Sequence, residues 1–554
     1  MKIVKEELLN GKIVAIKNTG GFLLLCNATN ESCVQRLRSI KKRTKKPFAV
    51  LAHSLDSACA LGHIGTVEEK ALTSYASPIT LCKKKENSNI APSVCSESPY
   101  VGIMLPSTAL LLLLTEDMPV LVATSGNISS MPLCIYDSEV FSTLSECDFF
   151  LSHNRKIASR IDDSVVHIIN ECVSTIRRAR GYIPSAFSIP NSMSISTPIL
   201  SSGCDLKNSF ALASKNKIYL SQYIGDLSSL QSISHYQSSI EFWKGLLSIK
   251  SHLGVCDIHP DMITTKTVQS INTATAHVQH HTAHLLANQL ENNIPYPYLG
   301  VVWDGTGLGD DHTVWGGEFF EVTEHRIQRI GSMESFPLPG GDKAVKEPRR
   351  SCLGALTQIK SSALITWAKQ VLSDEEVKVL SQCISSKINT PMTSSIGRLF
   401  DAAASLLNIC HTNEFEGHAA ILLEKLALNA KKKNTEYVIP ITKKENFYEV
   451  NALKILNEMY TDKKNGVPLP EIAYGFHLAL ARIIRNITEI VDLKRVALSG
   501  GVMQNKLLVE LTHLELNNIG ACVYIHKVIP TNDQGIAAGQ LLHLMMQNQH
   551  HHHL

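Results

Sequence analysis

The chain has 554 residues, of which 44% are hydrophobic, and its formal net charge is only +3. This length and composition predict a globular protein of two to four domains, and the small charge gives no argument for a nucleic-acid partner. The longest apolar stretch, Ala109–Leu114, is far shorter than a membrane span, Met1–Glu7 does not resemble a signal peptide, and the fourteen cysteines form no Cys-x-x-Cys pair. We therefore expect a cytoplasmic protein without a membrane partner.

Residues 1–190 alternate short strand and helix patterns, which predicts an α/β domain. A strand candidate at Ile13–Lys17 runs into a glycine turn, and a basic cluster, Lys41–Lys46, follows a helical segment that Pro47 stops. Cations on a turn beside glycine-rich backbone N–H groups suit a nucleotide or a phosphate ester. The alternative is a solvated basic loop, which the cluster by itself favours. The small polar residues Thr124–Asn127 can bind an oxyanion or a ribose, or form an ordinary turn.

From residue 198 to residue 545, a strand, a glycine turn with carboxylates and a helix recur in two halves. The turns are Asp304–Gly307, Pro339–Asp342, Ser499–Gly501 and Asn532–Gly535. Such a pair of α/β lobes resembles the actin and sugar-kinase (ASKHA) architecture, which closes on ATP. Residues Ser394–Asp401 open a further helix, whose N-terminus suits an anion. The Ser/Pro-rich stretch Ile189–Thr197 is predicted to be a linker, and residues 546–554 a disordered tail.

Four histidines precede the first glycine turn at offsets i, i+3, i+4 and i+7, so a helix would carry them on one stripe: His277, His280, His281 and His284. Two histidines at i and i+4 present their ring nitrogens to one point, and Asp304 can supply a carboxylate. The zinc-protease pattern needs a glutamate after the first histidine, and position 281 is a histidine, so that interpretation fails. The residues alone leave two interpretations open, a metal site and a solvated polar helix face.

The first region resembles the YrdC-type domain in Lys41-x-Arg43-x-x-x-Pro47, Ser77-Pro78-Ile79, Thr124-Ser125-Gly126-Asn127 and Arg178-Ala-Arg180-Gly181-Tyr182. The variant with Gly20-Gly21-Phe22 and Arg160-x-Asp162-Asp163-Ser164 resembles the domain inside the HypF family of hydrogenase-maturation carbamoyltransferases. The second region is similar to the carbamoyl-transfer domain of that family, in Val278-Gln279-His280-His281-x-Ala283-His284 and in the four glycine turns. The two resemblances cover nearly the whole chain in the order of that family.

The resemblance implies that residues 1–190 make carbamoyl-adenylate from ATP and a unit derived from carbamoyl phosphate or carbamate. Residues 198–545 would then pass the carbamoyl group to an acceptor. In the family the acceptor is the C-terminal cysteine thiol of a HypE-type protein, and the product becomes a cyanide ligand of the [NiFe] centre. The implied cofactors are ATP, Mg²⁺ and one iron or zinc ion. The acylphosphatase and zinc-finger domains of the family would precede residue 1, so the resemblance implies a separate acylphosphatase as partner, a different carbamoyl source, or a truncated chain.

The resemblance also implies roles for residues of this chain. The predicted catalytic residues, which would neutralise phosphate charge, are Lys41, Arg43 and Arg180. The predicted nucleotide and phosphate contacts are Lys17, Lys46, Ser125, Asn127, Lys207, Gly305, Gly307, Gly340, Asp342, Gly500, Gly501 and Asn505. The predicted metal ligands are His280, His284, Asp304 and Asp533.

Several positions depart from the patterns of the family. The Gly-Gly-Phe-His motif ends in Leu23, and the Leu-Pro-Tyr-Thr-Pro-Leu-His-His motif has Ser107, Leu111 and Leu112 where the family has Tyr, His and His. Thr282 replaces the third central histidine. Two alternatives therefore remain: an O-carbamoyl or threonylcarbamoyl (tRNA) transferase, and a degenerate protein that binds nucleotide and partners without turnover. The replacements favour the degenerate protein, and the intact metal set opposes it.

Overall fold

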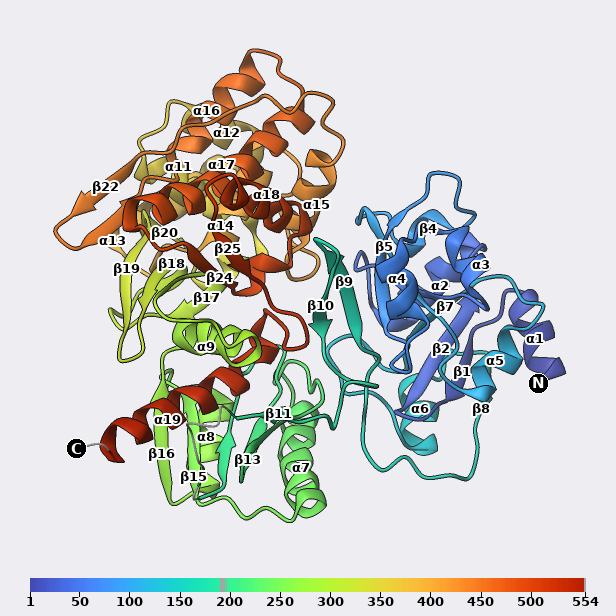
Figure 1. Cartoon of the computed structure of the whole chain (residues 1–554). Helices are drawn as coiled ribbons and strands as arrows, with labels where there is room; N and C mark the ends of the chain where they lie inside the picture. Colours follow the sequence, from blue (N-terminus) through green and yellow to red (C-terminus); the bar gives the residue numbers. More distant parts are fainter. Residues whose placement is uncertain (190–194, 196, 553–554) are drawn as a thin grey trace. The chain divides into compact units, whose positions relative to one another are not determined.

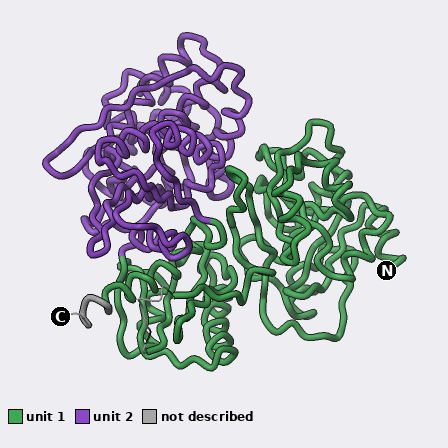
Figure 2. Tube along the Cα trace, in the orientation of Figure 1, with its two compact units in different colours: residues 1–278, 527–554 green, residues 279–526 purple. Residues whose placement is uncertain are grey.

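The computed structural model describes residues 1–189, 195 and 197–552, which form two compact units (Figure 2). Unit 1 comprises residues 1–278 and the C-terminal segment from 527 onward, and unit 2 comprises residues 279–526. The predicted linker lies largely outside the described residues. The division between the units falls inside the second predicted domain, so the limits predicted for the two domains stay a prediction. The α/β class expected from the sequence is confirmed.

Unit 1 begins with a mixed sheet in the order β10-β9-β5-β6-β3-β7-β2-β1-β8, with β4 beside β5 (Figure 1, blue to teal). Its strands are β1 (Val14–Lys17), β2 (Phe22–Asn27), β3 (Ala49–Leu51), β4 (Gly62–His63), β5 (Ile79–Lys84), β6 (Tyr100–Met104), β7 (Leu121–Ser125), β8 (Phe149–Leu151), β9 (Val165–Ile169) and β10 (Cys172–Arg177). Its helices are α1 (Lys2–Leu9), α2 (Glu31–Lys41), α3 (Leu55–Cys59), α4 (Thr66–Leu72), η1 (Pro92–Val94), α5 (Ala109–Thr115) and α6 (Asp137–Thr143).

Both faces of this sheet are buried, which explains the unbroken apolar run in β2. Leu24 and Cys26 point into a core that also holds Val34 of α2. Leu23 and Leu25 alternate to the opposite face, into a core that also holds Leu111 of α5. A strand covered on both faces has no position that requires a polar side chain.

The second sheet of unit 1 has the order β11-β14-β13-β12-β15-β16. Its strands are β11 (Phe187–Ser188), β12 (Ile199–Ser201), β13 (Ala211–Ser214), β14 (Lys217–Leu220), β15 (Leu253–Asp257) and β16 (Ala274–Val278). Its helices are α7 (Leu230–Leu247), α8 (Ile263–Ile271), η3 (Asp533–Gly535) and α19 (Ile536–His552). Strands β12, β15 and β16 are parallel, and α19 packs against β12 and β15. Because α19 continues to His552, residues 546–552 are helical, where the sequence predicted a disordered tail; no glycine or proline interrupts them.

Unit 2 is built on a sheet in the order β22-β23-β19-β18-β17-β24-β25, with β20 and β21 beside it (Figure 1). Its strands are β17 (Tyr298–Leu308), β18 (Val314–Val322), β19 (Ile327–Met333), β20 (Phe336–Pro337), β21 (Met392–Thr393), β22 (Ile441–Lys444), β23 (Phe447–Val450), β24 (Arg495–Ser499) and β25 (Cys522–Tyr524). Its helices are α9 (His280–Asn292), α10 (Asp342–Lys346), α11 (Pro348–Gln358), α12 (Ala363–Val371), α13 (Asp374–Ser386), α14 (Ile396–Leu406), α15 (His418–Ala427), α16 (Lys454–Lys464), α17 (Leu469–Val491), η2 (Gly501–Gln504) and α18 (Lys506–Asn517).

Two corrections concern the centre of unit 2. The sequence predicted a strand that ends before a glycine turn at Asp304–Gly307. Instead β17 continues to Leu308, and its pairing with β18 shifts register between Trp303 and Gly307. Such an irregularity leaves the residues inside it unpaired and redirects their side chains. Asp304 therefore lies within a distorted strand and not in a turn.

The second correction concerns the stripe of histidines. His277 lies in β16, whereas helix α9 begins at His280, because the Gln279 side chain accepts a hydrogen bond from Thr282 N and caps the helix. The helix carries only three of the four histidines, and all three are buried, so the solvated helix face is excluded. No helix among the described residues combines the length and apolarity needed to cross a membrane.

Candidate functional site

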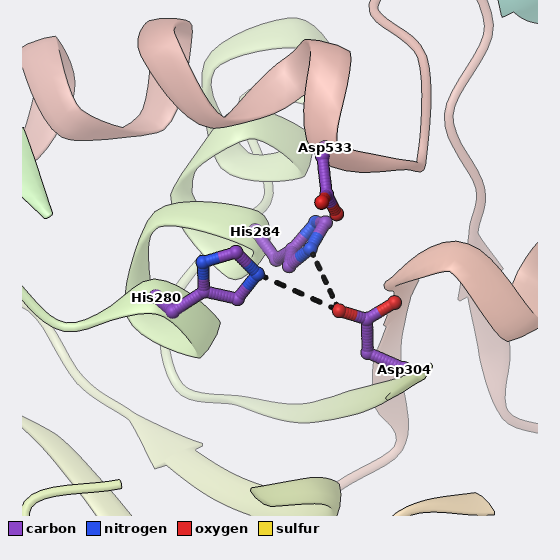
Figure 3. Close-up of side chains that lie close together, drawn as sticks. All are labelled: His280, His284, Asp304 and Asp533. Atoms are coloured by element: carbon purple, nitrogen blue, oxygen red, sulfur yellow. Dashed lines mark ion pairs between the residues drawn. The ribbon is translucent and has the colours of Figure 1, made fainter. Parts of the chain in front are cut away.

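The N-terminus of α9 and the distorted stretch of β17 bring two imidazoles and one carboxylate together in unit 2 (Figure 3). The His280 Nε2 atom lies 3.5 Å from Asp304 Oδ2, and the His284 Nε2 atom lies 3.4 Å from the same oxygen. All three residues are buried. The helical i, i+4 spacing that the sequence indicated therefore delivers both ring nitrogens to one carboxylate oxygen.

A glycine makes room for the histidines. A Cβ atom on Gly307 would lie 2.5 Å from the His281 ring and 2.8 Å from the His280 ring, so a side chain at that position would displace them. This close approach explains why the β17 segment beside α9 contains glycine. Gly305 is different, because nothing lies within 4 Å of a Cβ built there.

Two further contacts orient Asp304. Its Oδ1 atom accepts a hydrogen bond from Gly501 N at 2.9 Å, which leaves Oδ2 facing the imidazoles. The Ser395 hydroxyl, at the N-cap of α14, lies 2.8 Å from both Asp304 O and Gly305 O. β17 and β24 are parallel neighbours, so the carboxyl end of β24 naturally brings Gly501 to Asp304. The sequence predicted Gly501 as a nucleotide contact and the start of the helix at Ser394–Asp401 as an anion site, and it predicted neither as a contact of Asp304. A serine before a helical pattern indicates an N-cap, not a contact with a distant peptide.

The electrostatics of this cluster favour an ionised carboxylate and a neutral histidine beside it. Burial opposes ionisation of Asp304, but His280 and His284 next to it hold the pKa of that carboxyl well below its usual range. Burial, and after it the neighbouring His280, lower the pKa of His281 well below that of a free histidine. The His281 ring lies 5.9 Å from the Trp315 ring and is not one of the converging ligands.

The spacing of the three donors fits a metal ion. Distances of 3.4 and 3.5 Å exceed the usual 2.7–3.2 Å for an N–H···O hydrogen bond. Ligands of a tetrahedral zinc ion, each about 2.0–2.2 Å from the metal, lie about 3.3–3.6 Å apart. Two histidines and a carboxylate suit zinc, and they also suit non-haem iron. The donor atoms of these three residues lie within 4.8 Å of one another. Asp533, the fourth predicted ligand, belongs to unit 1, where it opens η3, and its place in the set stays a prediction.

The remaining predicted contacts of unit 2 lie at element ends. Gly500 has a φ of 94°, and a Cβ there would lie 2.2 Å from Trp303 O, so this position requires glycine. Gly340 also has a φ of 94°, and Asp342 opens α10. Asn505 caps α18 by accepting from Leu508 N at 2.9 Å, and its Nδ2 lies 3.1 Å from His477 Nε2. The side-chain amide of Asn505 therefore already takes part in hydrogen bonds within the folded chain.

In unit 1 the predicted adenylation residues gather around Lys41 at the end of α2. The Lys41 ammonium is buried and donates to Ser125 O, to Asn127 O at 2.8 Å and to Asn127 Oδ1 at 3.1 Å. The Ser125 hydroxyl in turn donates to Asn127 Oδ1 at 2.7 Å. An ammonium group has three donors. These three contacts tie Lys41 to the turn after β7, so this lysine holds the turn in place.

The other predicted cations also contact the fold. Arg43 donates from Nε to Lys46 O at 3.1 Å and from Nη2 to Pro47 O. The Lys17 ammonium is 3.2 Å from Asp137 Oδ1 and 3.1 Å from His153 O. Lys46 is exposed on the basic turn.

Arg180 is held beside Asp162 and Asp163, and its backbone N donates to Asp162 O at 3.1 Å. Its guanidinium pairs with Asp163 Oδ1 at 2.8 Å and donates to Ala76 O at 2.9 Å and Ser77 O at 3.0 Å. Lys207, in the second sheet region, has a φ of 43° and donates from its backbone N to Asp226 Oδ1 at 2.8 Å. Each contact fixes the position of a residue and leaves its predicted role to experiment.

Burial shifts the pKa values of several residues in this cluster toward their neutral forms. Burial, and after it the nearby Arg43, lower the pKa of Lys41 to about 7. Burial, and after it Arg177, lower the pKa of Arg43 to about 9. Burial also raises the pKa of the Asp162 carboxyl, although Arg177 and Lys41 oppose the change. An anion that enters beside such groups would stabilise their protonated forms.

The positions that depart from the family patterns fall into two groups. Leu23 and Leu111 share the apolar core between β2 and α5. Leu112 is exposed, and Ser107 lies at intermediate depth before α5. Both core leucines are therefore accommodated by packing against apolar neighbours.

Comparisons with known proteins cover both units. A family model described as "Telomere recombination", that of Sua5, YciO and YrdC, matches residues 6–179. "HypF Kae1-like domain" matches residues 194–291, and "Carbamoyltransferase, Kae1-like Domain, second subdomain" matches residues 300–540. The chain is 33% identical to carbamoyltransferase HypF of Synechocystis sp. PCC 6803, over 98% of this chain and 73% of that protein.

Two solved structures are similar over nearly the whole chain. One is full-length HypF in the phosphate- and nucleotide-bound form, with a TM-score of 0.93 and 34% identity, covering 99% of this chain and 86% of that one. The other is HypF of T. kodakarensis, with a TM-score of 0.91 and 30% identity, covering 99% of this chain and 74% of that one.

Proposed function

This chain belongs to the HypF carbamoyltransferase family, and on that premise we propose that it activates a carbamoyl unit with ATP and transfers it to a thiol. The observation that carries the proposal is the 33% identity to a carbamoyltransferase over 98% of the chain. We propose the C-terminal cysteine of a HypE-type protein as the acceptor, in a cytoplasmic route to the cyanide ligand of [NiFe]-hydrogenase. Carbamate, supplied directly or released from carbamoyl phosphate by an acylphosphatase activity, would provide the carbamoyl unit.

The first step would take place at the basic cluster of unit 1, with Mg²⁺ accompanying ATP. A carbamate oxygen forms a bond to the α-phosphorus, the bond from that phosphorus to the bridging oxygen breaks, and pyrophosphate leaves. Lys41, Arg43 and Arg180 would neutralise the charge that develops on the phosphates. Positioning and charge neutralisation carry most of the catalysis in phosphoryl-type transfers.

The turn held by Lys41 would place the substrate for this step. Its ammonium fixes Ser125 and Asn127 through three contacts, so these two residues form a preorganised edge for the nucleotide. Lys17 and Lys46 would approach the phosphates from the flanking strand and the basic turn.

The second step would use the cluster of unit 2. The acceptor thiolate forms a bond to the carbamoyl carbon, and the bond from that carbon to the AMP oxygen breaks. His280, His284 and Asp304 would hold an iron or zinc ion, and we propose that Asp533 adds a further carboxylate. When bound, such an ion acts as a Lewis acid that polarises a carbonyl or phosphoryl oxygen. Gly501 N holds one oxygen of the Asp304 carboxylate, so that the other faces the histidines, and the Ser395 hydroxyl holds the backbone carbonyl of Asp304.

In this step, glycines at the ends of strands and helices would contact the AMP part of the carbamoyl-adenylate. Gly305 leaves open space where a side chain would stand, and Gly500 allows the backbone to pass close to Trp303. The proposed contacts to nucleotide or phosphate are Gly305, Gly307, Gly340, Asp342, Gly500, Gly501, Asn505 and Lys207.

The proposal is tested with the purified chain, ATP, carbamoyl phosphate and an acylphosphatase. We expect ATP–pyrophosphate exchange that depends on carbamoyl phosphate, and mass spectrometry should detect one added carbamoyl group on a peptide that ends in the HypE-type cysteine. Exchange without peptide modification would redirect the search to a small-molecule hydroxyl or tRNA acceptor. Absence of exchange would contradict the proposal and leave a protein that binds nucleotide without turnover.

A further inference from the structure

Two segments far apart in the sequence lie side by side within unit 1. One is the end of β10 and the residues after it, and the other is the segment that leads into η3. Thr175 N donates to Lys527 O at 2.8 Å, and Asn532 Nδ2 donates to Ile176 O at 2.9 Å. The first segment runs into the Arg178–Arg180 motif, and the second contains Asp533. The predicted adenylation side is thus hydrogen-bonded to the peptides beside a proposed metal ligand.

Gln534 makes the tightest of these connections. Its Oε1 atom accepts from Arg178 N at 2.9 Å, and its Nε2 atom donates to Arg178 O at 2.7 Å. The side-chain amide thus satisfies both polar groups of one peptide residue, as a neighbouring strand would. Gln534 is completely buried, so water cannot replace these two bonds without rearrangement.

The turn that carries Asp533 is held from several directions. Asn532 Oδ1 accepts from Gln534 N at 3.1 Å, and the Ser209 hydroxyl donates to Gln534 O at 2.7 Å. The Cys204 thiol lies 3.7 Å from Asp533 O. These contacts fix the backbone on both sides of Asp533 and so limit the positions that its carboxylate can take.

Arg178 is a rigid anchor for this connection. Its guanidinium is completely buried and donates to Leu220 O at 3.0 Å, and to Tyr182 O and Ser185 O at 2.8 Å each. Two residues later, Arg180 pairs with Asp163. Gln534 is therefore hydrogen-bonded to a segment that is itself held by several hydrogen bonds, and not to a loop with few contacts.

We propose that Gln534 is a positioning residue, which holds the Asp533 carboxylate in place for metal binding by bonding its turn to Arg178. This inference rests on the proposed function, because it takes Asp533 as a metal ligand. Groups that orient a ligand without touching the metal typically change metal affinity by 10- to 100-fold when they are removed. Gln534 therefore connects the turn of the proposed ligand Asp533 to Arg178, which belongs to the proposed adenylation region.

The chain offers a matched control, Gln540, in the same C-terminal segment. Gln540 is also completely buried, and its Oε1 accepts from Ser201 Oγ at 2.7 Å and Gly203 N at 3.1 Å, while Nε2 donates to Gly203 O at 3.3 Å. It thus makes the same two-way contact with a peptide residue, but not with Arg178. Gln534→Met and Gln540→Met remove equivalent amides and keep the length of the side chain.

The experiment measures zinc affinity of the full chain by competition with a chromogenic chelator, for the unmodified protein, both methionine variants and Asp533→Asn. We expect Asp533→Asn and Gln534→Met each to lose at least about tenfold in affinity, and Gln540→Met to stay within about twofold. Melting temperatures should fall similarly in the two methionine variants, which separates positioning from general destabilisation.

The outcomes distinguish this inference from the proposed function. If the unmodified chain does not hold zinc, or Asp533→Asn binds zinc normally, the proposed metal role fails and the inference fails with it. If Asp533→Asn weakens binding and Gln534→Met does not, only the inference is overturned. Should Gln534→Met fail to fold, hydrogen exchange of the unmodified chain decides: zinc must slow exchange of the peptide that contains Arg178 N–H, and unchanged exchange contradicts the role of Gln534.

Discussion

Asp304 in the proposed metal cluster of unit 2 and Lys41 in the basic cluster of unit 1 are both buried, yet their charges are balanced in opposite ways. In unit 2, Asp304 faces two imidazoles across gaps of 3.4 and 3.5 Å, and the pKa of its carboxyl is held well below the usual range by His280 and His284 against the effect of burial. In unit 1, the Lys41 ammonium donates to oxygens of Ser125 and Asn127, and burial lowers its pKa to about 7.

The difference teaches how each cluster can accept its ligand. The donors of unit 2 are spaced as ligands around an ion, so binding adds an ion to a preformed frame. The cations of unit 1 are hydrogen-bonded to backbone carbonyl groups of unit 1. A bound anion would therefore meet a turn that is already hydrogen-bonded, and it would favour the protonated forms that burial disfavours. The following variants separate the two clusters, from the largest expected effect to the smallest.

Replacement of a metal ligand should have the largest effect. His284→Ala removes one of two imidazoles from Asp304, and we expect zinc affinity to fall by more than about 100-fold, since even outer groups cost 10- to 100-fold. Metal content after gel filtration measures this loss. The matched control is His281→Asn, on the same helix and equally buried but outside the cluster; an equal loss of metal in both variants would refute the assignment of His284.

Removal of the Lys41 charge should affect the other cluster alone. Lys41→Met deletes the three contacts to the turn, and we expect kcat/KM of ATP–pyrophosphate exchange to fall about 100-fold, the scale for one charge-stabilising donor. The control, Lys45→Met, removes an exposed cation of the same basic turn that pairs with Glu97 at 3.1 Å. Metal content should be normal in both variants. Unchanged exchange in Lys41→Met would show that the turn needs no cation.

Loss of the Ser395 hydroxyl should have an intermediate effect. Ser395→Ala removes the N-cap of α14 and the contacts to Asp304 O and Gly305 O, so we expect about 1 kcal/mol less stability and roughly tenfold lower zinc affinity. Ser373→Ala removes the equivalent cap of α13, far from these contacts in the sequence. It should lower stability by a similar amount and leave zinc affinity unchanged. A loss of affinity in both variants would assign the effect to stability alone.

The pH dependence of exchange should show the smallest effect. The pKa of Lys41 lies near 7 in the folded chain, below its ordinary value of 10.5, so the side chain is mostly protonated below pH 7 and mostly neutral above it. We expect kcat/KM to fall about threefold between pH 6.5 and 7.5, and the fall to be absent in Lys41→Met. Between pH 7 and 10.5 the Lys41 side chain binds more protons in the unfolded chain than in the folded chain. Its contribution to the free energy of unfolding therefore rises with pH in this range. A flat profile in the unmodified chain would contradict a role for the charged lysine.

The sequence predicted the features that depend on local geometry. The i, i+4 spacing of His280 and His284 placed both rings on one side of a helix, and the recurring order of strand, glycine turn and helix indicated the strand ahead of Asp304. It failed where tertiary hydrogen bonds decide the outcome. His277 belongs to a strand because Gln279 caps the helix after it, and β17 continues past Asp304 because its pairing with β18 resumes at Gly307.

Long-range contacts of polar side chains were also beyond the sequence. Ser395 is hydrogen-bonded to the backbone of Asp304, which is 91 positions away in the sequence, and Gln534 is hydrogen-bonded to Arg178, which is 356 positions away. A serine before a helix and a glutamine after an aspartate are common, so neither pattern indicates its distant partner. Lys41 was singled out for its charge, but its donors go to the turn at Ser125, which only the packing of α2 against the sheet could bring close.

The most direct test of the account follows both steps at once in His284→Ala, supplied with ATP, carbamoyl phosphate, acylphosphatase and the HypE-type peptide. Rapid quenching would measure pyrophosphate formation and peptide carbamoylation in the same samples. The account predicts pyrophosphate formation close to that of the unmodified chain, with carbamoylation of the peptide reduced by more than about 100-fold. Loss of both steps together, or carbamoylation at the normal rate, would contradict a division of the reaction between the basic cluster and the metal cluster.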